Sequence, residues 1–279
     1  MQHMVIKESS MVTEPIVILD IGCRWGFAER FLKPEHLGKF KIYGFDPDQE
    51  ECARLQAAYA HMPSGAVTCV PQGLAREIGR RNLYITKDPA CSSLHPPIQF
   101  LAENYPELDC IRLEKIISID VTTLKKWAQE NSIKNIDYIK IDTQGSELEI
   151  LKGAEEILES VNCIDIEVEF NPIYEGQSLF WEVDAYLRTK GFQLWRFPNI
   201  VHYSQDGQPR QLNETNSLIF DSSTKQETIA FGGQVFWADA RYVRTSVFSI
   251  PAEPTQRTKI INLFNALGMS DVIHSIPNT

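Results

Sequence analysis

Short apolar runs alternate with amphipathic stretches from residue 15 to about residue 197. The apolar runs have the length and composition of buried strands, and the stretches between them repeat apolar residues at helical spacing. Leu179, Val183 and Leu187 recur every four residues before Gly191, which predicts an amphipathic helix that stops at a glycine. Repeated strand–helix alternation predicts a mainly parallel sheet with helices on both faces.

The strands and two helix starts can be placed from the pattern. The predicted strands are residues 16–22, 41–46, 66–70, 136–142, 163–170 and 192–197, and residues 237–244 are expected to add a last, antiparallel strand. Asp48 is placed to cap a helix that ends near Ala60, and Ser146 with Glu149 matches the Ser-x-x-Glu capping box. The predicted fold is therefore one Rossmann-like α/β domain.

Three segments are expected along the chain. Residues 1–14 are predicted to be a flexible leader, residues 15–245 the α/β domain, and residues 246–279 a C-terminal helical appendage. No apolar run approaches the ~20 residues that span a bilayer. The first residues also lack the apolar core of a signal peptide.

Composition and charge narrow the classes of function. The chain has 279 residues, of which 43% are hydrophobic, and a formal net charge of −10. Proteins that bind nucleic acid usually present a basic face, so this charge argues against such a partner. The six cysteines are scattered without a Cys-x-x-Cys pair, which fits a reducing compartment and favours a cytoplasmic location.

The first predicted strand ends in a glycine turn. Asp20 precedes Gly22 and Gly26, and these glycines allow positive φ and close approach of a ligand to the backbone. Asp46 ends the second predicted strand, where its carboxylate can accept hydrogen bonds from both hydroxyls of a ribose. The combination predicts a cofactor that contains a nucleoside.

The glycine spacing selects among such cofactors. Dinucleotide enzymes use Gly-x-Gly-x-x-Gly to hold a pyrophosphate, whereas Asp20, Gly22 and Gly26 form Asp-x-Gly-x-x-x-Gly. The acidic residue would repel a pyrophosphate and attract the ammonium group of S-adenosylmethionine. A nicotinamide-dependent oxidoreductase is thereby disfavoured but stays an alternative, as does a cofactor-binding module without turnover.

These stretches resemble a known family. VILDIGCRWG, YGFDPD, CSSL, YIKIDTQGSELEILKGA and EVEFNPIYEGQSLFWEVDAYLRTKGFQLW, between residues 16 and 244, are similar to the FkbM-type methyltransferases, class I enzymes that use S-adenosylmethionine. The resemblance implies a seven-stranded sheet and methylation of a hydroxyl, often on a sugar, glycolipid or polyketide. A small molecule or a glycan is accordingly the expected acceptor in natural product biosynthesis.

The chain departs from the family pattern in its first turn and after its fourth predicted strand. Cys23, Arg24 and Trp25 fill the space where the family often has Asn. Gln144 stands where the family often has Glu, which puts an acid–base role at that position in doubt. Asp46 also replaces a frequent Glu but keeps the carboxylate.

The expected cofactor contacts combine the glycine turn with later strand ends. Gln72, Gly73 and Leu74 follow the third strand at the usual adenine position, where backbone contacts are favoured. Ser93 is either a contact of the methionine carboxylate or part of a proline-terminated loop. The full set is Asp20, Gly22, Cys23, Gly26, Asp46, Pro47, Gln72, Gly73, Leu74, Ser93 and Asp142.

Hydroxyl methylation requires a positioned oxygen and a way to remove its proton. Asp142, Glu169 and His202 are the candidate catalytic residues, because each is expected at or just after the end of a strand. Each also has a plainer interpretation. Asp142 fits a helix cap or a cofactor contact, Glu169 a solvated rim carboxylate, and His202 an exposed hairpin.

A metal-assisted scheme is the alternative to a general base. Asp142, Glu169 and Asn171 would supply the oxygen ligands that Mg²⁺ prefers. One His requires fewer coincidences than three aligned ligands, so the metal-free scheme with His202 is favoured slightly and no metal site is assigned. Asn171-Pro172-Ile173-Tyr174 resembles an amino-methylation signature, but it follows the fifth strand and is predicted to be a turn.

Overall fold

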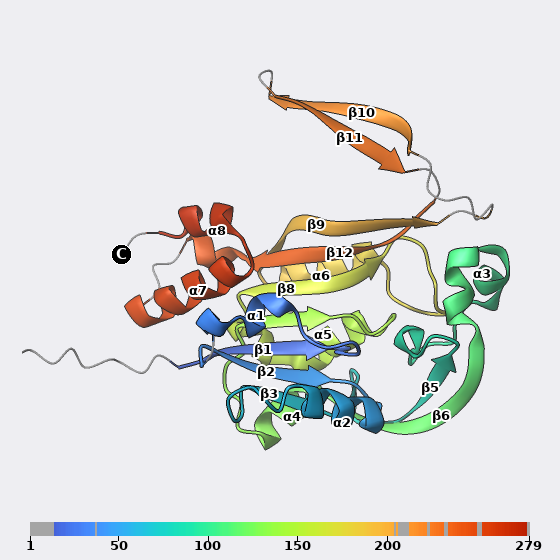
Figure 1. Cartoon of the computed structure of the whole chain (residues 1–279), viewed down its shortest axis with the longest axis horizontal. Helices are drawn as coiled ribbons and strands as arrows, with labels where there is room; N and C mark the ends of the chain where they lie inside the picture. Colours follow the sequence, from blue (N-terminus) through green and yellow to red (C-terminus); the bar gives the residue numbers. More distant parts are fainter. Residues whose placement is uncertain are drawn as a thin grey trace, which may run out of the picture.

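The computed structural model describes residues 14–36, 38–203, 205, 212–221, 224–231, 234–249 and 253–277. Residues 1–13 of the predicted leader lie outside this range. A seven-stranded sheet forms the centre, with the strand order β3-β2-β1-β7-β8-β12-β9 (Figure 1). Its strands are β1 (Ile16–Ile21), β2 (Phe40–Phe45), β3 (Val67–Val70), β7 (Tyr138–Ile141), β8 (Cys163–Glu169), β9 (Phe192–Tyr203) and β12 (Gln234–Arg244).

Strand direction confirms the predicted class of fold. β1 runs parallel to β2 on one side and to β7 on the other, and β7 runs parallel to β8. β12 lies antiparallel between β8 and β9. The chain order reverses between β1 and β7, and ligands of such sheets bind beyond the carboxyl ends of the strands at this reversal.

Helices cover both faces of the sheet because side chains alternate along the strands. On β1, Leu19 and Ile21 face one core and Ile16 and Ile18 the other. The first core includes side chains from α4 (Leu124–Glu130), α5 (Glu147–Ala154) and α6 (Phe180–Thr189). The second includes side chains from α1 (Glu29–Leu32), α2 (Gln49–Ala58), α7 (Pro254–Ala266) and α8 (Ser270–Ser275).

A second sheet was not predicted from the sequence pattern. β4 (Gly73–Leu74), β5 (Gly79–Thr86) and β6 (Leu113–Thr122) pair in the order β4-β6-β5. In Figure 1, β5 and β6 curve past the end of the central sheet opposite α7 and α8. Between β5 and β6 the chain forms η2 (Pro89–Cys91), α3 (Gln99–Asn104) and η3 (Pro106–Ile111).

The remaining elements complete the chain. β10 (Leu212–Asp221) and β11 (Thr224–Phe231) pair antiparallel as a separate hairpin inserted between β9 and β12. Short 3₁₀ turns are η1 (Pro34–His36), η4 (Glu155–Ser160) and η5 (Thr245–Phe248). Within the described residues, none of the helices is long and apolar enough to cross a membrane.

Two local predictions were wrong. Ser146 occupies the N-cap position of α5 but makes no side-chain cap hydrogen bond, and Glu149 pairs with Arg81 at 2.9 Å. The carboxylate of Glu147 instead reaches back and accepts from the backbone N–H groups of Thr143 at 2.7 Å and Gly145 at 2.9 Å. The carboxylate of Glu147, the first residue of α5, therefore binds the backbone N–H groups before the helix, and the predicted capping box of Ser146 and Glu149 does not form.

The second wrong prediction concerns the end of the sixth predicted strand. β9 continues to Tyr203 because it pairs with β12 along almost its whole length. His202 consequently lies inside β9, opposite Val235, and not in the segment after the strand. The cap at Asp48 was predicted correctly, since its side chain accepts from the N–H groups of Glu50 and Glu51.

Candidate active site

A cavity of about 710 Å³ lies at the carboxyl ends of β1, β2 and β7, and β5 and β6 form its far wall. Eight of the eleven predicted cofactor residues line it: Gly22, Asp46, Pro47, Gln72, Gly73, Leu74, Ser93 and Asp142. Its size is within the range of small-molecule sites. Asp20, Cys23 and Gly26 lie behind this lining.

The glycine turn is shaped by close backbone approach. Gly22 has φ +84°, and a Cβ on it would lie 1.7 Å from the carbonyl oxygen of Asp142. Gly26 has φ +105°, and its Cβ would lie 2.5 Å from the Tyr59 hydroxyl. Cys23 is 1% exposed and belongs to the second core. Gly22 therefore forms the floor of the cavity, while Gly26 and Cys23 pack behind it.

A lysine that was not predicted joins the two carboxylates beside this turn. Lys140 lines the cavity, and its Nζ lies 3.2 Å from Asp142 Oδ2 and 3.6 Å from Asp20 Oδ1. It also donates to the carbonyl oxygen of Gly22 at 3.2 Å. Burial alone would lower the pKa of Lys140, but the two carboxylates raise it above its ordinary value, so the ammonium persists. The trio carries a net charge of −1 when both acids are ionised.

Asp20 and Asp142 respond differently to this environment. Burial raises the pKa of Asp20 to about 6 although Lys140 acts in the opposite direction. Burial also acts to raise the pKa of Asp142, but Lys140 and a hydrogen bond from Gln144 outweigh it and hold that pKa below its ordinary value. Asp142 is therefore ionised at neutral pH and is a weak base.

Gln144, which follows β7, bridges the carboxylates of Asp142 and of Glu167 on β8. Its Nε2 donates to Asp142 Oδ1 at 2.9 Å and to Glu167 Oε2 at 2.7 Å. Burial and the neighbouring Asp142 raise the pKa of Glu167 well above its ordinary value. An amide can donate to both acids, whereas the Glu frequent at this position in the family would place a third carboxyl group here. The departure at Gln144 thus has a structural reason.

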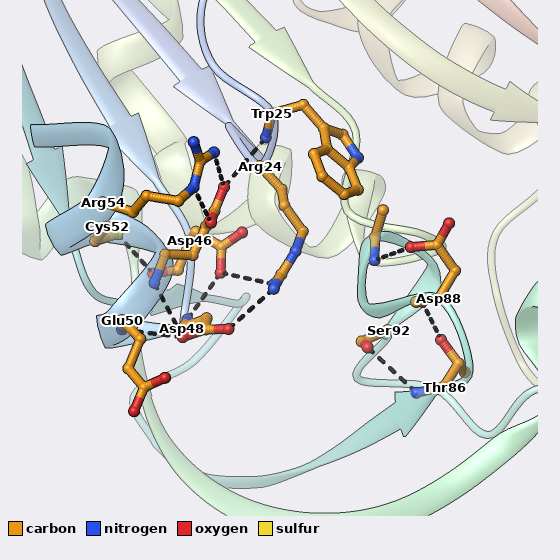
Figure 2. Close-up of polar contacts among 12 residues, drawn as sticks. Arg24, Trp25, Asp46, Asp48, Glu50, Cys52, Arg54, Thr86, Asp88 and Ser92 are labelled. Atoms are coloured by element: carbon orange, nitrogen blue, oxygen red, sulfur yellow. Dashed lines mark hydrogen bonds and ion pairs between the residues drawn. The ribbon is translucent and has the colours of Figure 1, made fainter. Parts of the chain in front are cut away.

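Asp46 lines the cavity at the carboxyl end of β2. This residue is 6% exposed, and its Oδ1 accepts from the backbone N–H of Asp48 at 2.8 Å. Arg24 reaches from the first turn to both acids, as Figure 2 shows, with Nη2 3.1 Å from Asp48 Oδ2 and Nη1 3.9 Å from Asp46 Oδ1. Burial raises the pKa of Asp46, while the Asp48 N–H and Arg24 partly offset that effect.

Ser93 and the Asn-Pro-Ile-Tyr segment fasten the loop that follows β5. Ser93 Oγ donates to the carbonyl of Gln144 at 2.6 Å and accepts from the N–H of His95 at 2.9 Å. The hydroxyl of Tyr174 lies 2.7 Å from the carbonyl of Cys91 and 3.0 Å from Gln144 Oε1. Asn171 to Tyr174 form a bent segment after β8, in which Tyr174 pairs with Pro97 in an isolated β-bridge, and they do not line the cavity.

Of the three candidate catalytic residues, the structure brings Asp142 to the cavity. Glu169 ends β8, is 2% exposed and is absent from the lining, so it is not a solvated rim carboxylate. Burial and the nearby Glu147 raise its pKa well above the ordinary value. His202 on β9 is also absent from the lining.

Of the oxygen set considered for Mg²⁺, Asp142 lines the cavity, whereas Glu169 and Asn171 do not. Asn171 Nδ2 donates to the carbonyl of Val235 at 2.6 Å. In the part of the chain that the structure describes, no three His, Cys, Asp or Glu side chains are grouped so that they could hold a metal ion.

Several residues that line the cavity had not been predicted as ligand contacts from the sequence. Trp25 is 72% exposed, and in Figure 2 its indole is on the side of the turn that faces the segment with Asp88 and Ser92. Ser146 Oγ is buried and has no hydrogen-bond partner among the described residues. Leu83, Ile85, Ile117 and Ile119 give β5 and β6 an apolar wall. Alternating apolar residues in LEKIISIDVT, residues 113–122, were the available signal for that wall.

The strand order and the cavity define a Rossmann-like methyltransferase fold of class I. The chain belongs to the FkbM methyltransferase family, because residues 20–194, more than half of its length, match the family described as the methyltransferase FkbM domain. This membership confirms the resemblance of the motifs and places the chain in a family of S-adenosylmethionine-dependent methyltransferases.

One relative is the 2-O-methyltransferase NoeI of Sinorhizobium fredii (strain NBRC 101917 / NGR234). The two chains are 28% identical over 165 residues, which cover 58% of this chain and 66% of that protein. The match thus spans just under two thirds of the length of the relative.

Solved structures with a similar arrangement include three methyltransferases. The precorrin-6y C5,15-methyltransferase of Geobacter metallireducens GS-15 is 10% identical, with 83% of this chain and 82% of that chain covered and a TM-score of 0.38. A SAM dependent methyltransferase of Aquifex aeolicus is 15% identical, with 83% and 84% covered and a TM-score of 0.37. TrmK of M. capricolum, in complex with S-adenosyl-homocysteine, is 10% identical, with 95% and 91% covered and a TM-score of 0.38.

Proposed function

We propose that this protein is an S-adenosylmethionine-dependent O-methyltransferase that methylates a hydroxyl of a sugar, a glycolipid, a polyketide or another natural product. The observation that carries the proposal is the convergence of Gly22, Asp46 and Asp142 on one cavity at the carboxyl ends of β1, β2 and β7, respectively. The name of the relative, a 2-O-methyltransferase, supports hydroxyl oxygen as the acceptor atom.

The residues present fit the cofactor. Asp142 at the lining and Asp20 behind it, both paired with Lys140, give this end of the cavity a negative charge for an ammonium group, and Gly22 permits the backbone to approach the ligand. Asp46 is the acceptor for the ribose hydroxyls. Pro47, Gly73, Leu74 and Ile119 give an apolar slot for adenine, since a Cβ on Gly73 would lie 3.0 Å from Ile119 and 3.8 Å from Pro47. S-adenosylmethionine supplies the methyl group when it is bound.

The acceptor is assigned to the half of the cavity that lies away from the adenine slot. Along β6, Ile117 is two residues farther than Ile119 from the adenine slot, a step of roughly 7 Å. Leu83 lies directly opposite Ile117 in the strand pairing, and both line the cavity. This apolar wall faces the polar end of β7, where Asp142 and Ser146 lie. An acceptor between them would place its hydroxyl beside Asp142.

Asp142 is the residue best placed to act on that hydroxyl. As an ionised carboxylate it can accept the hydrogen bond of the hydroxyl and direct the oxygen toward the methyl group. Its depressed pKa makes positioning its main contribution, with complete proton removal secondary. His202 as a general base and Mg²⁺ held by Asp142 and Glu169 remain the competing hypotheses.

A cytoplasmic location in a biosynthetic route is part of the proposal. All six cysteines are free thiols, and Cys23, Cys52 and Cys163 are buried. Free thiols persist where the compartment is reducing. An acceptor assembled in the cytoplasm would meet S-adenosylmethionine there.

The test is transfer of an isotopically labelled methyl group. Purified protein is incubated with labelled S-adenosylmethionine and either cell extract or a panel of hydroxylated acceptors, and mass spectrometry follows the label and S-adenosylhomocysteine. The proposal predicts a labelled methyl ether and an equal amount of S-adenosylhomocysteine. Cofactor binding by calorimetry without product would support a non-catalytic module. A change in absorbance at the nicotinamide band would support an oxidoreductase.

A further inference from the structure

Arg24 is the one arginine that lines the cavity in the described part of the chain, and it stands where the family often has Asn. It extends from the turn after β1 to the carboxylates that follow β2 (Figure 2). Its side chain is 19% exposed, which shows that the guanidinium is largely enclosed at the cavity wall. A cation in this position can donate hydrogen bonds to a ligand in the cavity, so Arg24 is a candidate for a binding residue.

The turn that carries Arg24 is fastened to α2. Trp25, the next residue, has φ +79°, a left-handed conformation that is unfavourable for a residue with a side chain. Its backbone N–H donates to Glu51 Oε1 at 3.4 Å, and Glu51 is also paired with Arg54 at 2.7 Å. These contacts fix the direction in which Arg24 leaves the turn.

The contacts of Asp46 leave room for a ligand between it and Arg24. Its Oδ1 accepts from the N–H of Asp48 and lies 3.9 Å from Arg24 Nη1. A separation of 3.9 Å is too long for a direct hydrogen bond. A hydroxyl, which both donates and accepts, can donate to the carboxylate of Asp46 while it accepts from the guanidinium.

We propose that Arg24 is a ribose-positioning residue that donates to a ribose hydroxyl of the cofactor and holds Asp46 in its binding orientation. This inference rests on the proposed cofactor and adds a contact that the family pattern does not contain. The enclosed guanidinium also favours the ionised form of Asp46 against the effect of burial. Two other roles are distinguishable: a latch on Asp48 alone, and a contact of the methionine carboxylate.

The experiment measures two ligands by calorimetry at one pH. S-adenosylhomocysteine has both the ribose and the amino acid part, whereas 5′-methylthioadenosine keeps the ribose and lacks the amino acid. Arg24→Gln is expected to weaken both ligands by a similar factor of about ten, because hydrogen bonds to charged groups are lost. Arg24→Lys should recover part of the loss, since it restores the charge without the planar donor set.

A double-mutant cycle connects Arg24 to Asp46. If both act on the ribose, Arg24→Gln in the Asp46→Asn background should weaken binding by no more than about twofold, less than its effect in the wild-type protein. Asp48→Asn keeps an N-cap for α2 and removes the ion pair, so it should weaken binding less than Arg24→Gln does. Arg188→Gln is the matched control, because Arg188 is 57% exposed, pairs with Asp184 on α6 and is absent from the cavity.

Each contrary result has a distinct meaning. Unchanged affinity in folded Arg24→Gln removes the residue from the ribose site. Loss for S-adenosylhomocysteine alone assigns Arg24 to the methionine carboxylate, and equal losses in Arg24→Gln and Asp48→Asn reduce it to a latch. A wild-type protein that binds neither ligand contradicts the proposed function itself, and the inference falls with it.

Discussion

The carbonyl oxygen of Asp142 occupies the space where a side chain on Gly22 would begin. A Cβ on Gly22 would lie 1.7 Å from that oxygen, and Gly22 has φ +84°. The backbone N–H of Asp142 also donates to the carbonyl of Ile21 at 2.9 Å. The turn after β1 and the end of β7 are therefore in backbone contact, and the cofactor floor and the proposed methyl-transfer residue have a fixed geometry.

The first prediction separates this contact from backbone strain. Gly22→Ala should lower the unfolding free energy by more than the ~1–2 kcal/mol of a left-handed residue, and it should abolish cofactor binding. Gly65→Ala is the matched control, because Gly65 has φ +74° but no heavy atom within 4 Å of its Cβ position. Chemical denaturation and calorimetry measure the two effects. Equal destabilisation of both variants, with normal binding, would contradict the contact.

The second prediction follows from the pKa of Asp20, which burial raises to about 6. If ionised Asp20 holds the ammonium of the cofactor, affinity for S-adenosylmethionine should be about tenfold lower at pH 5 than at pH 7.5. Asp20→Asn should bind weakly with a flat profile over this range. The ligand 5′-methylthioadenosine lacks the ammonium and should show no such decrease. A parallel decrease for both ligands would assign the titration to another group.

Asp20 should have the opposite effect on the stability of the protein without ligand. Its folded-state pKa of about 6 exceeds the ordinary value of 3.8, so the folded state binds more protons between these pH values. The contribution of Asp20 to stability is thus fully present below about pH 4 and is lost as the pH rises through 6. Comparison of wild type with Asp20→Asn in denaturation across this window isolates the effect.

The third prediction concerns a buried ion pair between α7 and the sheet. Lys259 Nζ lies 2.8 Å from Asp137 Oδ2, and the side chains are 11% and 4% exposed. Lys259→Met leaves a buried carboxylate without its cation and should cost about 3–5 kcal/mol in unfolding free energy. Lys126→Met removes an exposed pair with Glu130 and should cost about 1 kcal/mol or less.

Adding Asp137→Asn to Lys259→Met should recover part of the lost stability, because the unpaired charge is gone. Equal effects of Lys259→Met and Lys126→Met would show that this ion pair contributes little to the stability of the fold.

The sequence predicted the central sheet because its strands have strong local patterns. Buried runs such as residues 16–22 and 163–170 need no partner to be recognised, and Asp48 caps α2 through neighbours two and three residues away. The ribbon of β5 and β6 has a weaker signal, because apolar residues alternate only over Ile117, Ile119 and Val121 at the end of β6. Residues 113–118 of β6 are exposed to solvent, so their side chains do not show a two-residue burial alternation.

The site was predicted where backbone chemistry is local, as at Gly22, and missed where distant side chains meet. Lys140 lies inside a predicted strand, and only the fold places it between Asp20 and Asp142. In the same way, only the fold brings Arg24 close to Asp46 and Asp48. Spacing along the chain carries no signal for such pairs.

The last prediction separates positioning by Asp142 from a general base and from a metal. Asp142→Asn should lower the rate of label transfer by about 10²-fold or more, because the amide cannot accept and orient the hydroxyl as the carboxylate does. Affinity for S-adenosylhomocysteine, measured in the same variant, shows whether the cofactor still binds.

If His202 is the base, His202→Ala should reduce turnover by the ~10²–10⁴ of a lost general base and remove the rise of rate with pH through the imidazole range. Its place on β9, outside the cavity lining, leads us to expect less than a twofold change. A chelator that abolished turnover, with recovery on added Mg²⁺, would instead support the metal scheme with Asp142 and Glu169.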